Sequence, residues 1–307
     1  MAQISTITIG IPYYNRPKLI YRCLNSIAKA NSGNRICALI FDDGSPEELI
    51  IKKKFNFVVQ IIRSQKNVGV CEGRRALLEA ATSELFMILD SDDTIPEDFL
   101  QNIDEAFTDE LDGVLFKCKW DDNTLSPAVD FPDGTFTLAT LIEFIDRNPT
   151  KRVEWRSVVR TNTKNKVNWP HGHRKMERYH LDLVKNYRIE GNNKVIRNYH
   201  GDAEDQISKT GMHGDKTHIV TSDRVLGVIE LFNDFGTILA KHGPKRYLHQ
   251  KLFLLTHMHK LRIENVIKYK LLREEYPEYF CLHLRLASVL LYYLNKVRRK
   301  SRWLWPI

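Results

Sequence analysis

The sequence predicts an α/β fold in which helices cover both faces of a mostly parallel sheet, with a helical extension toward the C-terminal end. Within the first 120 residues, apolar runs of strand length alternate with segments of helical spacing, and the links between them are short. From about residue 225 onward the apolar pattern is mainly helical and the charge is basic. Alternation of strands and helices is typical of parallel sheets, whose strands are buried on both faces.

The first strand candidate, ISTITIGIP, is rich in Ile and Thr and stops at Pro12. A helix is expected from Arg16, because apolar residues follow at helical spacing and Pro17 suits a first helical turn. Two more helices are expected: GRRALLEAATS, which Gly73 opens, and PEDFLQNIDEAF, which begins at Pro96. The other strand candidates are CALIFDDGS, VVQIIRS, ELFMILDSDD and DGVLFKCKW.

The pattern changes beyond residue 120. Residues 121–140 are rich in turn formers and are expected to form a loop, and residues 141–224 are mixed, with many polar and His residues. We therefore expect one domain over residues 1–224 and a basic helical region over residues 225–307.

The formal net charge of +8 is unevenly placed. Residues 241–307 hold 15 Lys and Arg against 4 Asp and Glu, a net of +11, which leaves −3 for the rest of the chain. Cationic helices followed by SRWLWPI fit an anionic membrane surface, and packing on the preceding domain is the alternative. Nucleic acid is not expected as a partner, because the tail has no recognised binding motif and the N-terminal part is acidic.

No membrane-spanning helix or secretion signal is expected. No apolar stretch reaches 18 residues, and the N-terminus lacks a basic n-region. The five cysteines are scattered without a CxxC pair, which is typical of reduced thiols. We expect a cytoplasmic protein, either free or peripheral on the inner face of the cell membrane.

Two strand candidates end in acidic clusters, Asp42–Asp43 and the run of Asp90, Asp92 and Asp93. In parallel sheets, ligands bind beyond the carboxyl ends of the strands. Carboxylate oxygens are hard ligands that suit Mg²⁺ or Mn²⁺, and Mg²⁺ commonly bridges one or two carboxylates to substrate phosphates. On an extended segment, Asp90 and Asp92 would project to the same side. The alternative is that Asp92, Asp93 or Thr94 caps the helix near Pro96.

Four stretches in order resemble the family 2 inverting glycosyltransferases, which have the GT-A nucleotide-diphospho-sugar transferase fold. They are GIPYYNR, FDDGS, NVGVCEGRR and LDSDD, and the last resembles the D-x-D metal motif of the family. The resemblance covers roughly residues 5–120. It implies nucleotide-sugar binding by residues 1–120 and an acceptor side over 121–224.

The resemblance also implies donor-binding roles for individual residues. Asp92 would bind the Mn²⁺ or Mg²⁺ that bridges the donor diphosphate, and Asp90 would hold the ribose or support the metal. Either Asp42 or Asp43 would contact the nucleotide base. Arg74 would lie near the base and phosphates. The base pocket would be lined by Pro12 and Tyr14.

The sequence departs from the family pattern after Val70. Gly73 replaces the usual alanine and Arg75 the usual asparagine. Arg75 either adds a cation to the phosphate site or faces solvent.

An inverting transfer needs a carboxylate to accept the proton of the attacking hydroxyl. Glu177 stands where the family has its Glu, but Arg178 occupies the place of the usual Asp. Glu177 is the expected base, and Asp205 and Asp182 are alternatives. The alternative role of Glu177 is structural: its negative charge would stabilise the start of a helix without taking part in catalysis.

Aromatic and His residues between 155 and 218 suggest further contacts. Trp155 and Trp169 would either stack on an acceptor sugar or pack in the core. The His171-Gly-His173 pair lacks standard zinc spacing, so zinc is not expected.

The resulting prediction is a metal-dependent inverting glycosyltransferase. It would move a sugar, from a UDP-sugar as the expected donor, to a saccharide or lipid-linked acceptor in bacterial cell-surface polysaccharide synthesis. The alternative is a nucleotide-sugar-binding protein without catalysis. It is retained because Arg178 follows Glu177 where the family has an Asp.

Overall fold

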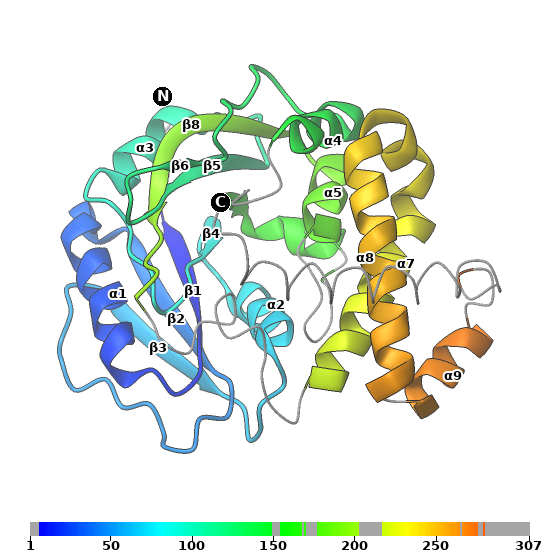
Figure 1. The fold of residues 1–307 in the computed structure, drawn as a ribbon. Helices are drawn as coiled ribbons and strands as arrows, with labels where there is room; N and C mark the ends of the chain where they lie inside the picture. Colours follow the sequence, from blue (N-terminus) through cyan, green and yellow to red (C-terminus); the bar gives the residue numbers. More distant parts are fainter. Residues whose placement is uncertain are drawn as a thin grey trace. The chain divides into compact units, whose positions relative to one another are not determined.

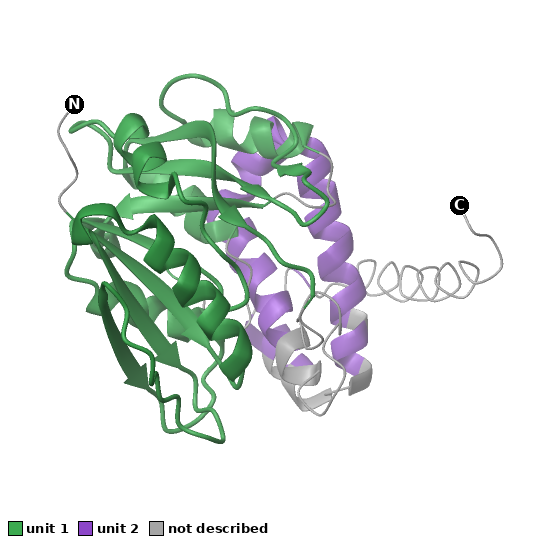
Figure 2. Cartoon of the chain, turned by 90° about the vertical axis from the view of Figure 1, so that its left-hand side faces the viewer, with its two compact units in different colours: residues 1–172, 176–209 green, residues 173–175, 210–307 purple. Residues whose placement is uncertain are grey.

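The computed structural model describes residues 6–148, 154–167, 169, 177–202, 217–264, 266–275 and 279. The chain divides into two compact units, shown in Figure 2. The first unit holds residues 1–172 and 176–209, and the second holds residues 173–175 and 210–307. The expected boundary at residues 224 and 225 falls within a single helix of the second unit.

The parallel half of the sheet carries the strands that the first ninety residues predict. Its strands lie in the order β3-β2-β1-β4, and neighbouring strands are parallel (Figure 1). Their bounds are β1 Ile7–Tyr13, β2 Ile36–Asp42, β3 Val58–Arg63 and β4 Leu85–Ile88.

The other half of the sheet is mixed, which the sequence pattern did not predict. Strand β7, Trp155–Arg160, runs antiparallel between β4 and β5, Gly113–Lys119. The two-residue strand β6, Leu125–Ser126, pairs antiparallel with the end of β5. Strand β8, Ile189–Asn198, runs parallel to β5. The predicted α/β class is confirmed, with a mixed rather than mostly parallel sheet.

Helices cover both faces of the sheet. The inward side chains of β1 at Ile7, Ile9 and Ile11 share one core cluster with residues of α1 and α3. On the other face α2 lies close to the sheet, because a Cβ at Gly10 would meet both Phe86 and Leu77. The helices and 3₁₀ turns of this unit are α1 Pro17–Ala30, η1 Ser32–Asn34, α2 Val70–Ala80, α3 Phe99–Ala106, α4 Leu138–Arg147, η2 Thr161–Asn165 and α5 Glu177–Asn186.

Two predicted helix starts are wrong. Helix α2 begins at Val70 rather than at Gly73. The Asp43 carboxylate accepts the N–H groups of Val68 and Gly69, so the chain is already anchored just before the earlier start. Helix α3 begins at Phe99, because the segment from Pro96 to Phe99 forms a turn closed by Phe99 N–H donating to Pro96 O.

The turn-rich stretch 121–140 also contains regular structure. It includes β6 and the start of α4, where Thr137 and Thr140 form a reciprocal capping box. Capping by two threonines is less easily recognised than the usual Ser or Thr with Glu, and this is why the stretch looks like loop throughout.

The second unit is helical, as expected. Its helices are α7 Thr217–His242, α8 Pro244–Glu264 and α9 Val266–Glu275. Buried apolar side chains of α7 and α8, among them Val225, Ile229, Met258 and Leu261, form its core. Within the residues that the structure describes, no helix combines the length and apolar character needed to cross a membrane. The predicted helix FCLHLRLASVLLYYLNKVRRK and the SRWLWPI segment lie outside the described residues.

Gly44 provides a test of the turn that follows β2. Its φ is +69°, and a Cβ there would lie 2.5 Å from the carbonyl carbon of Lys66. We expect Gly44→Ala to lower the free energy of unfolding by about 2–4 kcal/mol, since a left-handed backbone and a clash both add cost. Urea denaturation followed by circular dichroism measures this loss.

Gly134 is the matched control, because its φ is +82° but a Cβ there would meet nothing within 4 Å. Gly134→Ala should cost only the backbone strain, about 1–2 kcal/mol. Equal losses in the two variants would contradict the proposed clash at Gly44.

Candidate functional site

The candidate site lies at the carboxyl ends of neighbouring parallel strands. Tyr13 at the end of β1 is in register with Asp42 at the end of β2. On the other side of β1, Leu89 N–H donates to Gly10 O and continues the pairing of β4 for one residue. The acidic run from Asp90 to Asp93 follows at once, at the same edge of the sheet as the end of β2.

The acidic run is a turn, not the extended segment that the sequence suggested. Asp93 N–H donates to Asp90 O at 3.0 Å, which folds the four residues back. Strand β4 therefore ends at Ile88, two residues before the first aspartate. The turn lets the aspartates face different partners.

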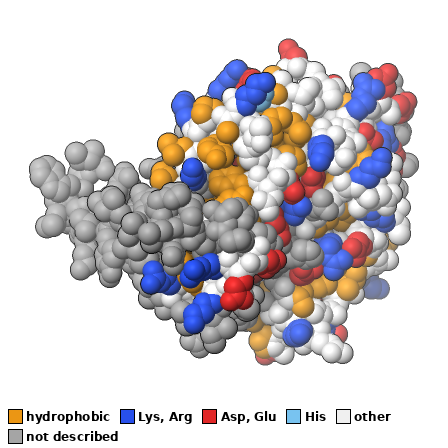
Figure 3. Space-filling view, turned by 90° about the vertical axis from the view of Figure 1, so that its right-hand side faces the viewer, with side chains coloured by type: hydrophobic (Ala, Val, Ile, Leu, Met, Phe, Trp, Pro, Cys, Tyr) orange, Lys and Arg blue, Asp and Glu red, His pale blue; other side chains and the backbone are white. Residues whose placement is uncertain are grey.

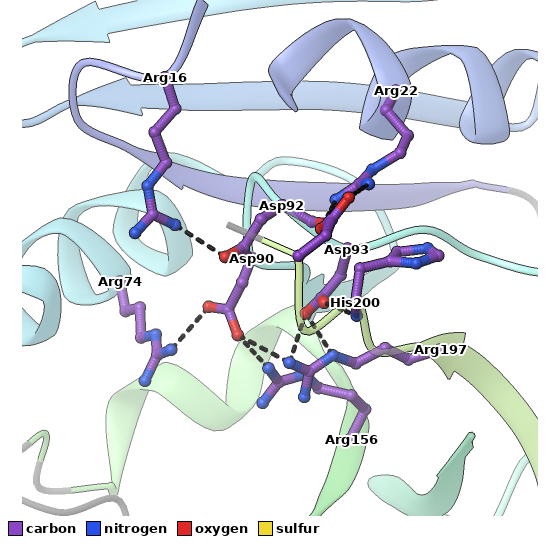
Figure 4. Close-up of polar contacts among 10 residues, drawn as sticks. Arg16, Arg22, Arg74, Asp90, Asp92, Asp93, Arg156, Arg197 and His200 are labelled. Atoms are coloured by element: carbon purple, nitrogen blue, oxygen red, sulfur yellow. Dashed lines mark hydrogen bonds and ion pairs between the residues drawn. The ribbon is translucent and has the colours of Figure 1, made fainter. Parts of the chain in front are cut away.

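Arginine side chains from five separate segments surround this turn (Figure 4). They come from the β1–α1 loop, α1, α2, β7 and β8. The residues are Arg16, Arg22, Arg74, Arg156 and Arg197.

Asp90 is bound by three of these guanidinium groups. Arg74 donates to Oδ1 at 2.7 Å, while Arg156 and Arg197 both donate to Oδ2, Arg197 at 3.2 Å. Burial opposes ionisation of this carboxyl, but the attraction of Arg156, Arg74 and Arg197 outweighs it and holds the pKa of Asp90 well below its usual range. Asp90 is therefore an anion at neutral pH.

Asp93 is the most deeply buried aspartate of the turn, with 1% of its side chain exposed. Arg197, whose side chain is 2% exposed, donates Nε–H to Asp93 Oδ2 at 2.5 Å, and His200 N–H donates to the other oxygen at 3.1 Å. Burial disfavours the charged guanidinium, but Asp93 and Asp90 more than compensate and raise the pKa of Arg197 above its usual value. The alternative that Asp92, Asp93 or Thr94 caps the next helix is wrong, because α3 begins at Phe99 and Asp98 stands at its N-cap position.

Asp92 is the aspartate whose contacts leave room for a ligand. Arg16 donates to its Oδ2 at 2.8 Å, and Arg22 donates to its backbone carbonyl at 2.6 Å. Among the described residues, no side chain or backbone N–H is hydrogen-bonded to Oδ1 of Asp92. A hard cation fits that oxygen, since Mg²⁺ needs only one or two carboxylates when substrate phosphates complete its shell.

No all-protein metal site is seen in the described part of the chain. Over those residues, no group of three or more His, Cys, Asp or Glu side chains gathers in a way that could hold an ion. Asp90 is the less suitable ligand, because both of its oxygens already accept from arginines. Any ion held here would depend on oxygens that a ligand brings.

The aspartates that end β2 hold the local structure. Asp42 is fully buried, accepts Ser45 N–H at 3.0 Å and pairs with Arg63 at 2.9 Å. Asp43 accepts the N–H groups that precede α2, as described above. Pro12 lies on β1, and Tyr14 just beyond it is 43% exposed.

The two arginines at the start of α2 have different partners. Arg74 reaches Asp90, whereas Arg75 pairs with Glu72 and Glu79 on its own helix. Packing explains why residue 73 is a glycine, because a Cβ at Gly73 would lie 2.9 Å from the Phe41 ring. Arg75 is thus neither bound to the acidic turn nor simply solvated.

The three candidate bases differ in their positions. Glu177 is the first residue of α5 and is partly exposed, whereas Asp182 is 4% exposed within the same helix. Burial does not favour Asp182 as a proton acceptor for a bound substrate. Asp205 lies outside the described residues.

Several site residues were missed by the sequence reasoning. Arg16 lies inside the quoted GIPYYNR stretch, so its proximity to a strand end was a usable signal. Arg156 and Arg197 lie in the loosely matching region, and no local pattern marks them. His200 has no expected role from the sequence, yet it hydrogen-bonds Thr94 through Nε2 at 2.9 Å and Asp121 through Nδ1 at 3.0 Å.

The predicted aromatic residues are both buried. Trp155 packs among Phe131, Phe144 and His180 in the core. Trp169 packs against Tyr179 with ring centroids 4.4 Å apart. His171 and His173 lie outside the described residues.

Comparison with known proteins identifies similar glycosyltransferases. A family model described as "Glycosyl transferase family 2" matches residues 8–200. An uncharacterized glycosyltransferase of Haemophilus influenzae is 30% identical over 87 residues, which cover 28% of this chain and 29% of that protein. An N-acetylglucosaminyltransferase of Neorhizobium galegae is 26% identical over 114 residues, 35% of this chain and 26% of that protein. The match thus spans less than a third of either relative.

Solved structures share the fold. A structure of S. aureus TarS residues 1–349 in complex with UDP-GlcNAc superposes with a TM-score of 0.55 at 20% identity, covering 84% of this chain and 72% of that one. A longer TarS structure gives a TM-score of 0.57 at 19% identity and covers 94% of this chain and 54% of that one. The expected GT-A fold is thereby confirmed.

The buried pair of Arg197 and Asp93 provides a test of the charge balance. We expect Arg197→Met to lower the free energy of unfolding by about 3–5 kcal/mol, because it leaves a buried carboxylate without its cation. Urea denaturation at neutral pH measures the change.

The control is Arg188→Met, which breaks an exposed pair with Glu110 at 2.9 Å. Exposed pairs contribute little, so this variant should lose less than about 1 kcal/mol. A loss in Arg197→Met no larger than in this control would show that the acidic turn does not depend on Arg197.

Proposed function

We propose that this chain, which belongs to glycosyltransferase family 2, transfers a sugar from a nucleoside-diphosphate donor to a saccharide or lipid-linked acceptor with inversion. The observation that carries the proposal is the arginine-bound acidic turn at the carboxyl end of β4. It combines concentrated guanidinium groups with carboxylates at the edge of a parallel sheet, where nucleotides bind in such folds. These are the groups that a diphosphate and its counter-ion need.

The partly exposed guanidinium groups of the site suit an anionic ligand. Five guanidinium groups face the three carboxylates of the turn, and two further carboxylates pair with them, Asp202 with Arg22 and Glu154 with Arg197 at 3.5 Å. Arginine forms paired hydrogen bonds with phosphate oxygens, so those arginines that retain some exposure can donate their remaining N–H groups to a diphosphate. Arg16 and Arg74 suit this role, with 17% and 15% of their side chains exposed.

We assign the divalent cation, Mn²⁺ or Mg²⁺, to Asp92, whose Oδ1 has no hydrogen bond from the described residues. When bound, the ion would neutralise charge that develops on the departing nucleoside diphosphate. Asp90, held as an anion by its arginines, would keep Arg74 and Arg156 in place and could accept from the ribose. We propose that the nucleotide base of the donor lies against Pro12 and Tyr14. Asp42 and Asp43 would hold the turn beside this base.

The donor is proposed to be a UDP-sugar, and UDP-N-acetylglucosamine is the first to test. One relative is named as an N-acetylglucosaminyltransferase, and a structure with the same fold contains UDP-GlcNAc. The setting we propose is assembly of a bacterial cell-surface polysaccharide.

The residue proposed as the proton acceptor is Glu177, at the partly exposed start of α5. Arg178 beside it keeps a second function open, a nucleotide-sugar-binding protein without turnover, because the family has a carboxylate at that position. Release of UDP in the presence of acceptor separates the two.

The proposed role of Glu177 as the catalytic base can be tested by substitution. Glu177→Gln should lower kcat by at least about 100-fold while UDP-sugar affinity changes little, because general base catalysis contributes 10²–10⁴-fold. The measurement is UDP release together with calorimetric titration of the UDP-sugar.

Glu97→Gln is the matched control, since Glu97 is an exposed carboxylate paired only loosely with Lys29 at 3.8 Å. It should keep full turnover. Retained turnover in Glu177→Gln would exclude this residue and make Asp205→Asn the next variant, with Asp182→Asn after it. Absence of turnover in the wild-type chain with every donor that binds would favour the binding-protein alternative.

We also propose that the helical second unit contacts an anionic membrane. On α8, Leu248 and Leu252 are exposed and stand beside Lys245 and Lys251. Figure 3 shows a face of the molecule on which hydrophobic side chains lie next to Lys and Arg. Exposed apolar residues flanked by cations are the composition that binds an anionic bilayer surface.

Liposome co-sedimentation tests this contact. The double substitution Lys245→Glu and Lys251→Glu should weaken binding to phosphatidylglycerol vesicles by at least tenfold at low salt, since each Lys near the surface contributes about 1 kcal/mol. Lys18→Glu with Lys54→Glu, two exposed lysines of the first unit, should have less effect. Equal weakening in both double variants would mean that net charge alone, and not α8, governs binding.

A further inference from the structure

A second candidate binding site lies on the first unit, apart from the acidic turn. It is a pocket of about 210 Å³ with walls from three segments. Helix α2 contributes Arg75 and Glu79, the stretch that includes η2 contributes Lys164 and Trp169, and the start of α5 contributes Arg178. Its volume suits one substituent or part of a sugar ring, because sites for whole ligands are commonly 300 Å³ or more.

The walls of this pocket are predominantly cationic. Three of its side chains are Lys or Arg and one is a carboxylate. Arg75 is compensated by Glu72 and Glu79, at 3.1 and 2.6 Å. Among the described residues, Lys164 donates only to an uncharged group, the backbone carbonyl of Glu79, at 3.3 Å. Lys164 therefore adds a positive charge that no carboxylate of the described residues neutralises, and this charge favours an anion.

The side chain of Trp169 lines the pocket and carries a buried N–H group. Its side chain is more than nine-tenths buried, at 8% exposure, and its ring packs on Tyr179. The indole Nε1 is buried and has no hydrogen-bond acceptor within the described ranges. A buried N–H without an acceptor is costly, so an oxygen atom supplied by a ligand would stabilise it.

Two residues that line the pocket directly follow, in the sequence, two residues of the proposed reaction. Arg75 follows Arg74, which binds Asp90, and Arg178 follows Glu177, the proposed base. Helices α2 and α5 thus each present one residue for the transfer and the next residue to the pocket. A substrate anchored in the pocket would be held by the same two helices that carry the chemistry.

We propose that this pocket binds an anionic substituent of the acceptor, a phosphate or a carboxylate attached to a saccharide, and that it selects acidic acceptor glycans. This assignment rests on the proposed transferase function. Lys164 and Arg178 attract the charged oxygens, Trp169 donates to one of them, and the apolar remainder of the lining contacts the ring.

Calorimetric titration of the full chain tests the pocket directly. With UDP at saturation to occupy the donor site, glycerol phosphate and methyl glucuronide are titrated separately. We expect at least one to bind, and Lys164→Ala to weaken that binding by about tenfold, because a charge-assisted hydrogen bond is lost. Trp169→Phe, which keeps an aromatic side chain but removes the indole Nε1–H, should weaken it by about threefold or more. The preferred probe identifies the substituent as phosphate or carboxylate.

The matched control is Lys166→Ala, an exposed lysine two residues from Lys164 that does not line the pocket. Its affinity for either probe should change less than twofold. The inference is overturned if neither probe binds the wild-type chain, or if Lys166→Ala and Lys164→Ala weaken binding equally.

A separate titration with UDP-N-acetylglucosamine keeps the two proposals distinguishable. Binding of the donor without binding of either anion removes the pocket assignment and leaves the proposed function intact. Binding of the anion that depends on Lys164, in a chain that releases no UDP, removes the transferase function and retains an anion site.

Discussion

Concentrated negative charge at the end of β4 can be buried only because guanidinium groups from five separate segments surround it. Asp90 accepts from three arginines, and Asp93 is enclosed by Arg197 and the backbone of His200. A buried carboxylate without such partners would take up a proton or unfold its surroundings. The strands and helices that supply these arginines must therefore reach their places for the turn to exist.

The same arrangement suits the anionic donor that we propose. The arginines are already gathered and oriented by the aspartates, so little side-chain ordering is left to do when a diphosphate arrives. Asp92 is the least engaged of the three carboxylates, and it is the one that the family resemblance assigns to the metal. With the metal assignment that we propose, charge balance and metal binding would be separate tasks of different members of one acidic turn.

Neighbouring residues with different partners recur in this unit. Asp42 and Asp43 are adjacent, yet one ties the end of β2 to Arg63 and the other anchors the start of α2. Arg74 and Arg75 are adjacent, yet one binds Asp90 and the other lines the cationic pocket. Successive residues of a helix or strand point in different directions, so a short motif in sequence distributes its side chains over separate sites.

The strand and helix order of the first 120 residues, the acidic strand ends and the helical character from about residue 225 were determined by the sequence itself, because they depend on apolar periodicity and turn formers within short windows. Arg74 and Asp92 could be named for the same reason, since both lie in recognisable local motifs. Only the tertiary structure decided what neutralises the aspartates. Arg156 and Arg197 stand 66 and 107 residues from Asp90 in the chain, and they reach it because β7 pairs with β4 and β8 pairs with β5. Strand pairing over such distances is selected by the packing of the whole sheet, and no local pattern encodes it.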